Sequence, residues 1–129
     1  MNNLKISQVQ FTASQIPNLN SKFLEKYFNK ALKSKPHLIC TPECSNIITN
    51  DKNYLKKNAP YQNTCPVLKM AKNFAKKNKV NINLGSLLLK VKNKSKLVNR
   101  SFFIDNHGVI KKIYDKIHMF DVKINNKEK

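Results

Sequence analysis

Residues 37–43 read HLICTPE, and this short stretch decides the fold class. Its first five residues are mostly apolar and do not alternate with polar ones, which is typical of a strand buried on both faces. Pro42 and Glu43 end the strand. Because such strands occur where helices cover a mostly parallel sheet, the stretch predicts an α/β layered fold.

The segments before this strand follow a strand pattern and then a helix pattern. Residues 5–11 predict a short first strand, and a turn at Pro17 leads into apolar residues at helical spacing that end with Leu32. Residues 34–36 end the helix, because the residue before a proline disfavours the helical conformation.

The segment after Glu43 predicts a loop followed by a second helix. Residues 45–63 are polar and predict a loop or one short helix. Pro66 suits the first turn of a helix. The apolar residues expected on one face of that helix are Val67, Leu68, Ala71, Phe74 and Ala75.

The last segments predict strands. Residues 80–91 predict a strand interrupted by Gly85, and residues 97–104 and 109–114 predict a β-hairpin around a turn at 105–108. The order strand, helix, strand, helix, strand, hairpin predicts one α/β domain over residues 1–129. Its sheet ends without a further helix, so the domain is expected to be partial.

The composition bounds the classes of function. The chain has 25 Lys and Arg against 7 Asp and Glu, a net charge of +18, which attracts phosphate groups without sequence preference. The basic residues are spread along the chain, Arg100 is the only arginine, and no nucleic-acid-binding motif is present. A lysine-rich surface is therefore favoured over a specific nucleic-acid site.

The sequence also limits the expected cellular location and the possibility of metal binding. No apolar run is long enough to span a bilayer and the start has no secretory signal, so a cytoplasmic protein without a membrane partner is expected. The three cysteines and three histidines have no metal-ligand spacing, and the cysteines are expected to be reduced.

Glu43 is the first candidate for chemistry. It follows the buried strand directly, at the carboxyl end where α/β folds place ligand sites. Partial removal from water would raise the pKa of this carboxyl toward the range of a general base. A capping or turn carboxylate after Pro42 is the alternative, and position alone does not decide between them.

Lys116 is the second candidate. It lies at the carboxyl end of the hairpin's return strand, which is expected at the same sheet edge as Glu43. Most of the basic residues are surface charges, so its spacing alone favours a surface lysine.

Two motifs together resemble a known family. TPE at residues 41–43 and YDKIHMFDV at residues 114–122 resemble two of the three signature regions of the nitrilase superfamily of carbon–nitrogen hydrolases. NINLGS at residues 81–86 and NRSF at residues 99–102 also look like the first half of that family. The second motif is similar to the branch containing omega-amidase and the amidase of deaminated glutathione.

The resemblance implies the N-terminal half of an α-β-β-α sandwich and a Glu-Lys-Cys site. Glu43 would be the general base for a cysteine thiol, and Lys116 would stabilise the oxyanion of the tetrahedral intermediates. A small linear amide is the implied substrate, and no metal or organic cofactor is required. Members often form dimers, so a homo-oligomer is expected for the full-length form.

The family's nucleophilic cysteine lies after the lysine, whereas this sequence has no cysteine after Lys116. Cys44 adjoins Glu43, but neighbours in extended backbone point to opposite faces, and Cys40 and Cys65 are expected to be structural. His118 is expected to orient its loop. Asp115 and Asp121 are expected to pair with nearby lysines, and Met119 and Phe120 to pack.

Two functions of different classes follow. The first is an amidase fragment that lacks its cysteine and is inactive alone. The second is a noncatalytic basic module that binds anionic partners such as nucleic acid.

Overall fold

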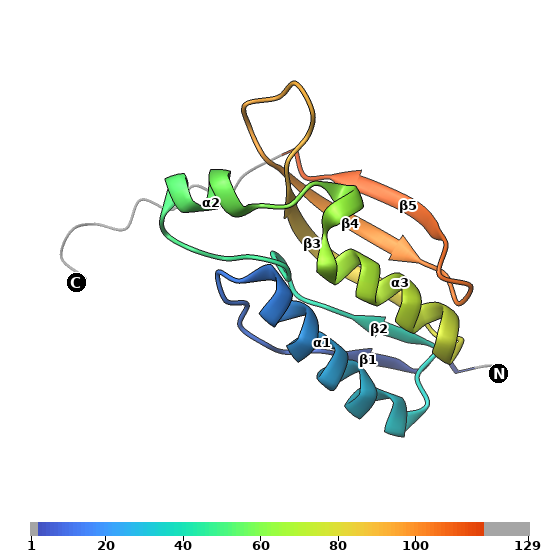
Figure 1. Ribbon diagram of the computed structural model, residues 1–129. Coiled ribbons are helices and arrows are strands. Elements are labelled where there is room, and N and C mark those ends of the chain that lie inside the picture. Colours follow the sequence, from blue (N-terminus) through green and yellow to red (C-terminus); the bar gives the residue numbers. More distant parts are fainter. Residues whose placement is uncertain (1–2, 118–129) are drawn as a thin grey trace.

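The structure is a computed structural model that describes residues 3–117. In this range the chain forms a five-stranded sheet in the order β1-β2-β3-β4-β5, with helices packed against it (Figure 1). The elements are β1 (Ile6–Gln8), α1 (Pro17–Ala31), η1 (Leu32–Ser34), β2 (Leu38–Cys40), α2 (Lys52–Asn58), η2 (Gln62–Thr64), α3 (Pro66–Asn78), β3 (Asn81–Leu89), β4 (Val98–Ile104) and β5 (Ile110–Asp115).

The sheet is mixed. β1, β2 and β3 are parallel neighbours, whereas β3, β4 and β5 are antiparallel. The predicted α/β class and element order are confirmed. Of the two predictions for residues 45–63, the short helix is correct in the form of α2, with Asp51 capping it by accepting from the backbone N–H groups of Asn53 and Tyr54.

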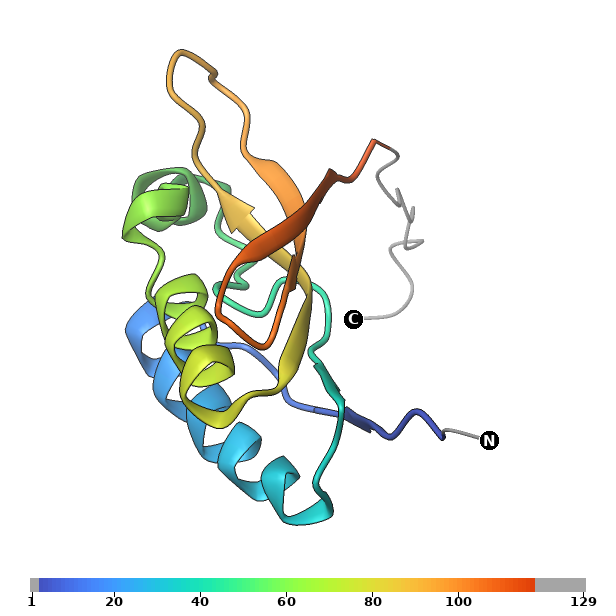
Figure 2. The same ribbon diagram turned by 90° about the vertical axis from the view of Figure 1, so that its right-hand side faces the viewer.

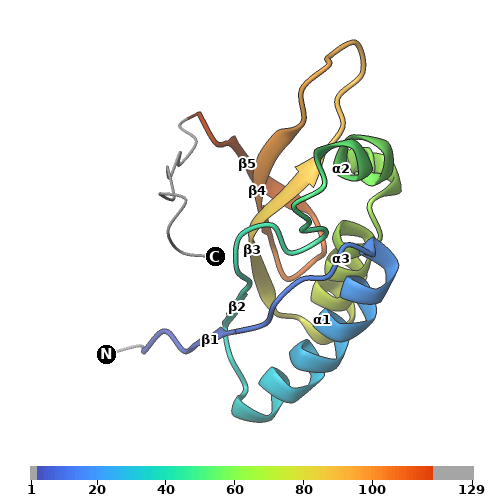
Figure 3. The same ribbon diagram turned by 90° about the vertical axis from the view of Figure 1, so that its left-hand side faces the viewer.

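Both long helices lie on the same side of the sheet (Figures 2 and 3). Each begins with a proline in its first turn, where the missing N–H removes no helical hydrogen bond. Phe28 of α1 and Phe74 of α3 pack edge to face with their ring centroids 5.2 Å apart. The buried face of α3 comprises Val67, Leu68, Ala71, Phe74 and Ala75, as the sequence predicts.

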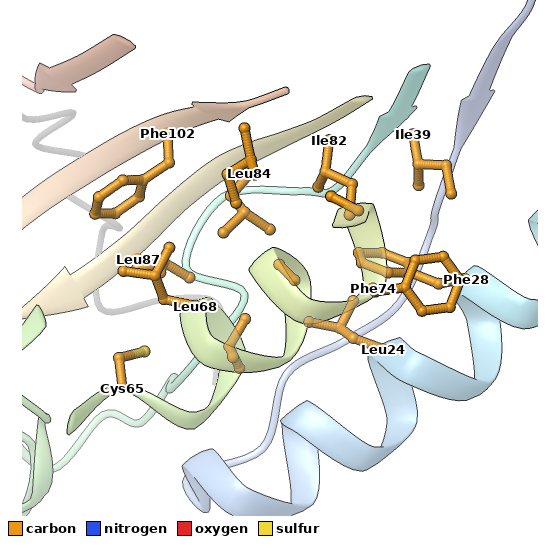
Figure 4. Packing of buried hydrophobic residues seen from close by; sticks show 14 of the residues in the cluster. Leu24, Phe28, Ile39, Cys65, Leu68, Phe74, Ile82, Leu84, Leu87 and Phe102 are labelled. Atoms are coloured by element: carbon orange, nitrogen blue, oxygen red, sulfur yellow. The ribbon is translucent and has the colours of Figure 1, made fainter. Parts of the chain in front are cut away.

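The hydrophobic core lies between these helices and the sheet (Figure 4). Ile39, Ile82 and Ile104 share one register row across β2, β3 and β4, and all three are fully buried. Leu84 and Phe102 form the next row. Burial of each such side chain contributes about 1.5–3 kcal/mol, so these rows fix which side of the sheet the helices cover.

The opposite side of the sheet is not covered by the described residues. Leu38 and Cys40, which flank Ile39 in β2, are only partly buried, as are Asn83 and Phe103 in the same row as Cys40. The prediction that β2 is buried on both faces is therefore wrong for residues 3–117, since α1 and α3 cover one face only.

Within residues 3–117 no helix is long and apolar enough to cross a membrane.

Candidate active site

The turn that follows β2 presents Glu43. Cys44 adopts a positive φ of 52°, so the backbone turns back rather than continuing as a strand. Its N–H donates to Ser86 Oγ at 2.9 Å, and the next N–H, of Ser45, donates to the Ser86 carbonyl at 3.0 Å. Ser45 Oγ donates to Thr41 Oγ1 at 3.0 Å. Before Glu43, the Thr41 N–H donates to the Asn83 carbonyl at 3.0 Å, so the turn is bonded to β3 on both sides of Glu43.

Asn46 anchors the end of this turn. Its side chain is fully buried, donates from Nδ2 to the Leu88 carbonyl at 2.8 Å and accepts the Leu88 N–H at 2.8 Å. The buried Asn20 of α1 donates to the Asn46 carbonyl at 2.8 Å. The Asn46 side chain thus pairs with β3 as a neighbouring strand would, and the Asn46 carbonyl connects the turn to α1.

Gly85 allows the turn to lie close to β3. A Cβ at this position would lie 2.7 Å from the carbonyl oxygen of Pro42, which is too close for any side chain. The strand register shifts between Leu84 and Leu87 at the same place. The glycine that interrupts the apolar pattern in the sequence therefore marks the contact that positions Glu43.

Lys116 reaches Glu43 from the end of β5. It follows β5 directly, and its N–H donates to the Asn99 carbonyl at 2.8 Å. Its Nζ lies 2.5 Å from Glu43 Oε1. The predicted proximity of Glu43 and Lys116 is confirmed, across 73 positions of sequence.

Asn99 is a site residue that no functional argument from the sequence singled out. Its Nδ2 donates to Glu43 Oε1 at 3.0 Å, so this oxygen accepts from two side chains. The Asn99 Oδ1 atom is buried and has no hydrogen-bond partner among the described residues. Its place in the NRSF segment is the one sequence signal that pointed to it.

The electrostatics of Glu43 differ from the expectation. The hydrogen bond from Lys116 lowers the pKa of Glu43, and the charge of Lys116 and the hydrogen bond from Asn99 act in the same direction. Partial burial opposes these effects but is the weaker influence, since the Glu43 side chain is 56% exposed. The expected rise in pKa is wrong in this structure, because an ammonium contacts the carboxyl and water reaches it.

Asp115 and Arg100 form a pair beside the site. Arg100 donates from Nε and Nη2 to the two carboxylate oxygens of Asp115, at 2.5 and 2.8 Å, and from Nη1 to Gln62 at 2.7 Å. The hydrogen bond from Arg100 lowers the pKa of Asp115. The expectation of a lysine partner for Asp115 is wrong, because Arg100 lies opposite it in the register of β4 and β5.

A hollow of about 460 Å³ opens beside the pair. It is lined by Glu43, Gly85, Ser86, Ser101, Tyr114 and Lys116. Hydroxyl groups, an ammonium and a carboxylate therefore surround a space large enough for a small polar molecule.

The three cysteines lie in environments that raise the pKa of their thiols. Cys44 lies in a left-handed turn, so the expectation of extended geometry at this position is wrong. Burial raises the pKa of its thiol, and the charge of Glu43 raises it further. Burial also raises the pKa of the thiols of Cys40 and Cys65. The thiolate is the attacking form, and these environments disfavour it.

Within the described part of the chain, no cluster of three His, Cys, Asp or Glu side chains could hold a metal ion. Several predictions fall outside the described residues: His118 as the residue that orients the loop, Met119 and Phe120 as packing residues, and Asp121 as the partner of a lysine.

Comparison with known proteins agrees with the two motifs. The profile of the carbon–nitrogen hydrolase family matches residues 7–129. The deaminated glutathione amidase of Dictyostelium discoideum is 31% identical over 133 residues, covering 98% of this chain and 46% of that protein. The corresponding protein of Yersinia enterocolitica is 29% identical over 125 residues, covering 96% and 43%. The chain spans about half the length of the curated relatives it matches.

Solved structures share the fold. The C. elegans NitFhit protein superposes with a TM-score of 0.78 at 25% identity, over 96% of this chain and 30% of that one. An amidase from Nesterenkonia sp. superposes with a TM-score of 0.76 at 16% identity, over 92% and 44%. The chain therefore belongs to the carbon–nitrogen hydrolase family, within the nitrilase superfamily, and its similarity is to the branch of omega-amidase and deaminated glutathione amidase.

Proposed function

We propose that this chain is the first half of an amidase that hydrolyses non-peptide carbon–nitrogen bonds in small linear amides, such as an ω-amide of a dicarboxylic acid. One observation carries the proposal: a carboxylate and an ammonium from two distant segments lie 2.5 Å apart beside a hollow of small-molecule size. The similarity to amidases of deaminated glutathione supports the same class of substrate.

The proposed chemistry requires a cysteine thiol next to this pair. Glu43 accepts the thiol proton, and the thiolate attacks the amide carbon. Lys116 donates to the oxyanion of the tetrahedral intermediate, and Glu43 passes its proton to the departing nitrogen, so that ammonia leaves and a thioester remains. Glu43 then takes a proton from water, which attacks the thioester through a second oxyanion, and returns the proton to the departing sulfur, giving the carboxylic acid and the free thiol. Loss of one oxyanion donor costs about 10²–10³ in turnover, so Lys116 is expected to matter to that order.

The exposure of Glu43 to water affects its proposed role as a general base. A carboxylate that is 56% exposed and paired with an ammonium is a weak base. In an α-β-β-α sandwich a second layer would cover the side of the sheet that α1 and α3 leave open. We propose that this covering removes water from Glu43 and raises its affinity for the proton.

The experiment uses the whole protein that the gene encodes. For the wild type, Glu43→Gln and Lys116→Met, ammonia release is measured with α-ketoglutaramate, and release of the free amine cysteinylglycine is measured with deaminated glutathione. Both variants are expected to lose at least about 10² in kcat. Glu25→Gln, which alters an exposed carboxylate of α1, is the matched control. Full activity in both site variants would contradict the proposal.

We also propose that the 129 residues alone do not hydrolyse amides. The three cysteines precede Lys116, and the thiol nearest the pair, Cys44, is held in its protonated form by burial. Ammonia release by the purified 129-residue chain, above that of its Glu43→Gln variant, would contradict this. The coding sequence beyond Lys129 is a direct test, since a further strand followed by a cysteine motif is expected there.

A noncatalytic basic module is the alternative, and the net charge of +18 favours it. It predicts binding of RNA or DNA whose log affinity falls steeply with log salt. Absence of binding at low ionic strength would exclude it.

For the amidase we propose a homo-oligomeric full-length form and a cytoplasmic location, which cell fractionation would test. We propose neither a specific nucleic-acid partner nor a membrane partner for it.

A further inference from the structure

A second hollow lies on the helix-covered side of the sheet. It has a volume of about 550 Å³ and is formed by η2, the first half of α3, the segment after β3, and residues of β4 and β5. We call it the basic pocket. It shares no lining residue with the hollow beside Glu43 and Lys116. The two hollows therefore lie on different parts of the molecule, and the proposed amidase chemistry does not use this one.

The lining of the basic pocket carries positive charge only. Its charged residues are Lys69, Lys72, Lys90, Lys92 and Arg100, and no Asp or Glu lines it. Of three other hollows in residues 3–117, two include a glutamate, Glu25 or Glu43, and the third has a single cation, Lys30. An even spread of lysines over the surface does not account for five cations gathered in one hollow without a carboxylate.

Two of the five cations already have partners. Arg100 donates hydrogen bonds to Asp115 and Gln62. Lys90 donates to the Lys57 carbonyl at 2.7 Å, and its Nζ lies 5.8 Å from the ring centroid of Tyr61. Among residues 3–117, Lys69, Lys72 and Lys92 form no ion pair. Three exposed ammonium groups on flexible stems are thus free to move toward a common ligand.

The rest of the pocket is suited to hold an anion. Cys65 and Leu68 form a buried apolar base, with exposed fractions of 1% and 3%. Walls of low polarity focus the field of the surrounding cations into the hollow. Asn63 and Asn73 add amide donors at the wall. The volume falls within the range of about 300–1,000 Å³ that is usual for small-molecule sites.

We propose that the basic pocket binds a small molecule that carries two or more phosphoryl groups. Three free ammonium groups match a ligand with several adjacent negative charges better than a single carboxylate. A nucleic-acid strand is disfavoured, since these cations converge on one hollow of ligand size and the arginine is already committed to Asp115.

The test is isothermal titration of the 129-residue chain with inorganic tripolyphosphate at moderate salt, with citrate and a short DNA oligonucleotide as comparison ligands. Tripolyphosphate is expected to bind with one-to-one stoichiometry and to raise the melting temperature. The Lys69→Gln/Lys72→Gln variant is expected to bind about tenfold or more weakly. The control Lys22→Gln/Lys26→Gln removes the same charge from the exposed face of α1 and is expected to change affinity less than about twofold.

Several results would overturn the proposal. An equal loss of affinity in the two double variants would show diffuse attraction to the whole surface. Citrate binding as tightly as tripolyphosphate would refute the phosphoryl class, and tighter binding of the oligonucleotide per phosphate would point to a nucleic-acid surface. Absence of both heat and thermal stabilisation at millimolar tripolyphosphate would exclude the site. None of these outcomes depends on Glu43 or Lys116, so the amidase proposal is tested separately.

Discussion

The turn at residues 41–46 and the ion pair at its tip are built in opposite ways. Thr41, Ser45 and Asn46 are 7%, 0% and 0% exposed, and their side-chain polar groups are hydrogen-bonded. Glu43 and Lys116 are 56% and 37% exposed. The residues that position the site are thus buried, whereas those that would perform its chemistry lie in water.

This difference separates stability from function. A buried polar group that loses its partner costs its full desolvation free energy, about 1–3 kcal/mol, whereas an exposed ion pair contributes about 0–1 kcal/mol. Substitutions in the buried turn should therefore lower the free energy of unfolding strongly, and substitutions at the tip should change it little. The predictions below test this contrast, from the largest expected effect to the smallest.

Asn46→Ala should have the largest effect. It leaves both the N–H and the carbonyl of Leu88 without the partner they have at 2.8 Å, so we expect the free energy of unfolding to fall by about 3 kcal/mol. Urea denaturation followed by circular dichroism measures this. Asn50→Ala, at an exposed position in the same loop, is the control and should change it by less than about 0.5 kcal/mol. Equal effects would break the contrast.

Gly85→Ala should come next. The new Cβ would lie 2.7 Å from the Pro42 carbonyl oxygen, so the turn must move away from β3. We expect a loss of about 2 kcal/mol in the same denaturation experiment. Asn83→Ala, a half-buried position two residues earlier in β3, should cost less. If Gly85→Ala proved neutral, the turn would be more adaptable than its buried hydrogen bonds indicate.

The Arg100–Asp115 pair should have an intermediate effect. A double-mutant cycle with Arg100→Met and Asp115→Asn should give a coupling free energy of about 0.5–1 kcal/mol at pH 7, after screening by water. Because Arg100 lowers the pKa of Asp115 in the folded state, this contribution is present above the unfolded pKa of about 3.9. It should shrink as the pH falls through the folded pKa. A coupling that grows on acidification would contradict the assigned pair.

The elements with strong local patterns were predictable from the sequence. The apolar face of α3 follows the helical period, and the hairpin of β4 and β5 follows from its turn residues. Motif order also predicted that Glu43 and Lys116 lie together. These features depend on residues close in sequence or on a resemblance that carries spatial information.

The unpredicted features depend on contacts between distant residues. Asn46 pairs with Leu88 across 42 positions, and an asparagine in a polar loop gives no sign of this. The partner of Asp115 depends on the strand register, which composition does not specify. The direction of the Glu43 pKa shift depends on whether an ammonium or an apolar wall lies nearer, and only the geometry decides that.

Glu43→Gln should have the smallest effect on stability, within about 0.5 kcal/mol, because the carboxyl lies largely in water. For the wild-type protein, the sensitive measurement is the titration of the Glu43 carboxyl carbon by NMR. Its midpoint should lie below the ordinary value of about 4.3, since Lys116 and Asn99 stabilise the charged form. Any stability this carboxyl contributes is then present above about pH 4.3 and is lost as the pH falls through its folded pKa.

Lys116→Met should move that midpoint upward, because it removes the hydrogen bond that lowers the pKa most. Lys112→Met, an exposed lysine of β5, is the control and should leave the midpoint nearly unchanged. A wild-type midpoint at or above about 4.3 would mean that burial already outweighs the ammonium. In that case Glu43 would already have the proton affinity of a general base without a second layer over the sheet. Its exposure to water would then give no reason to propose that a second layer is needed.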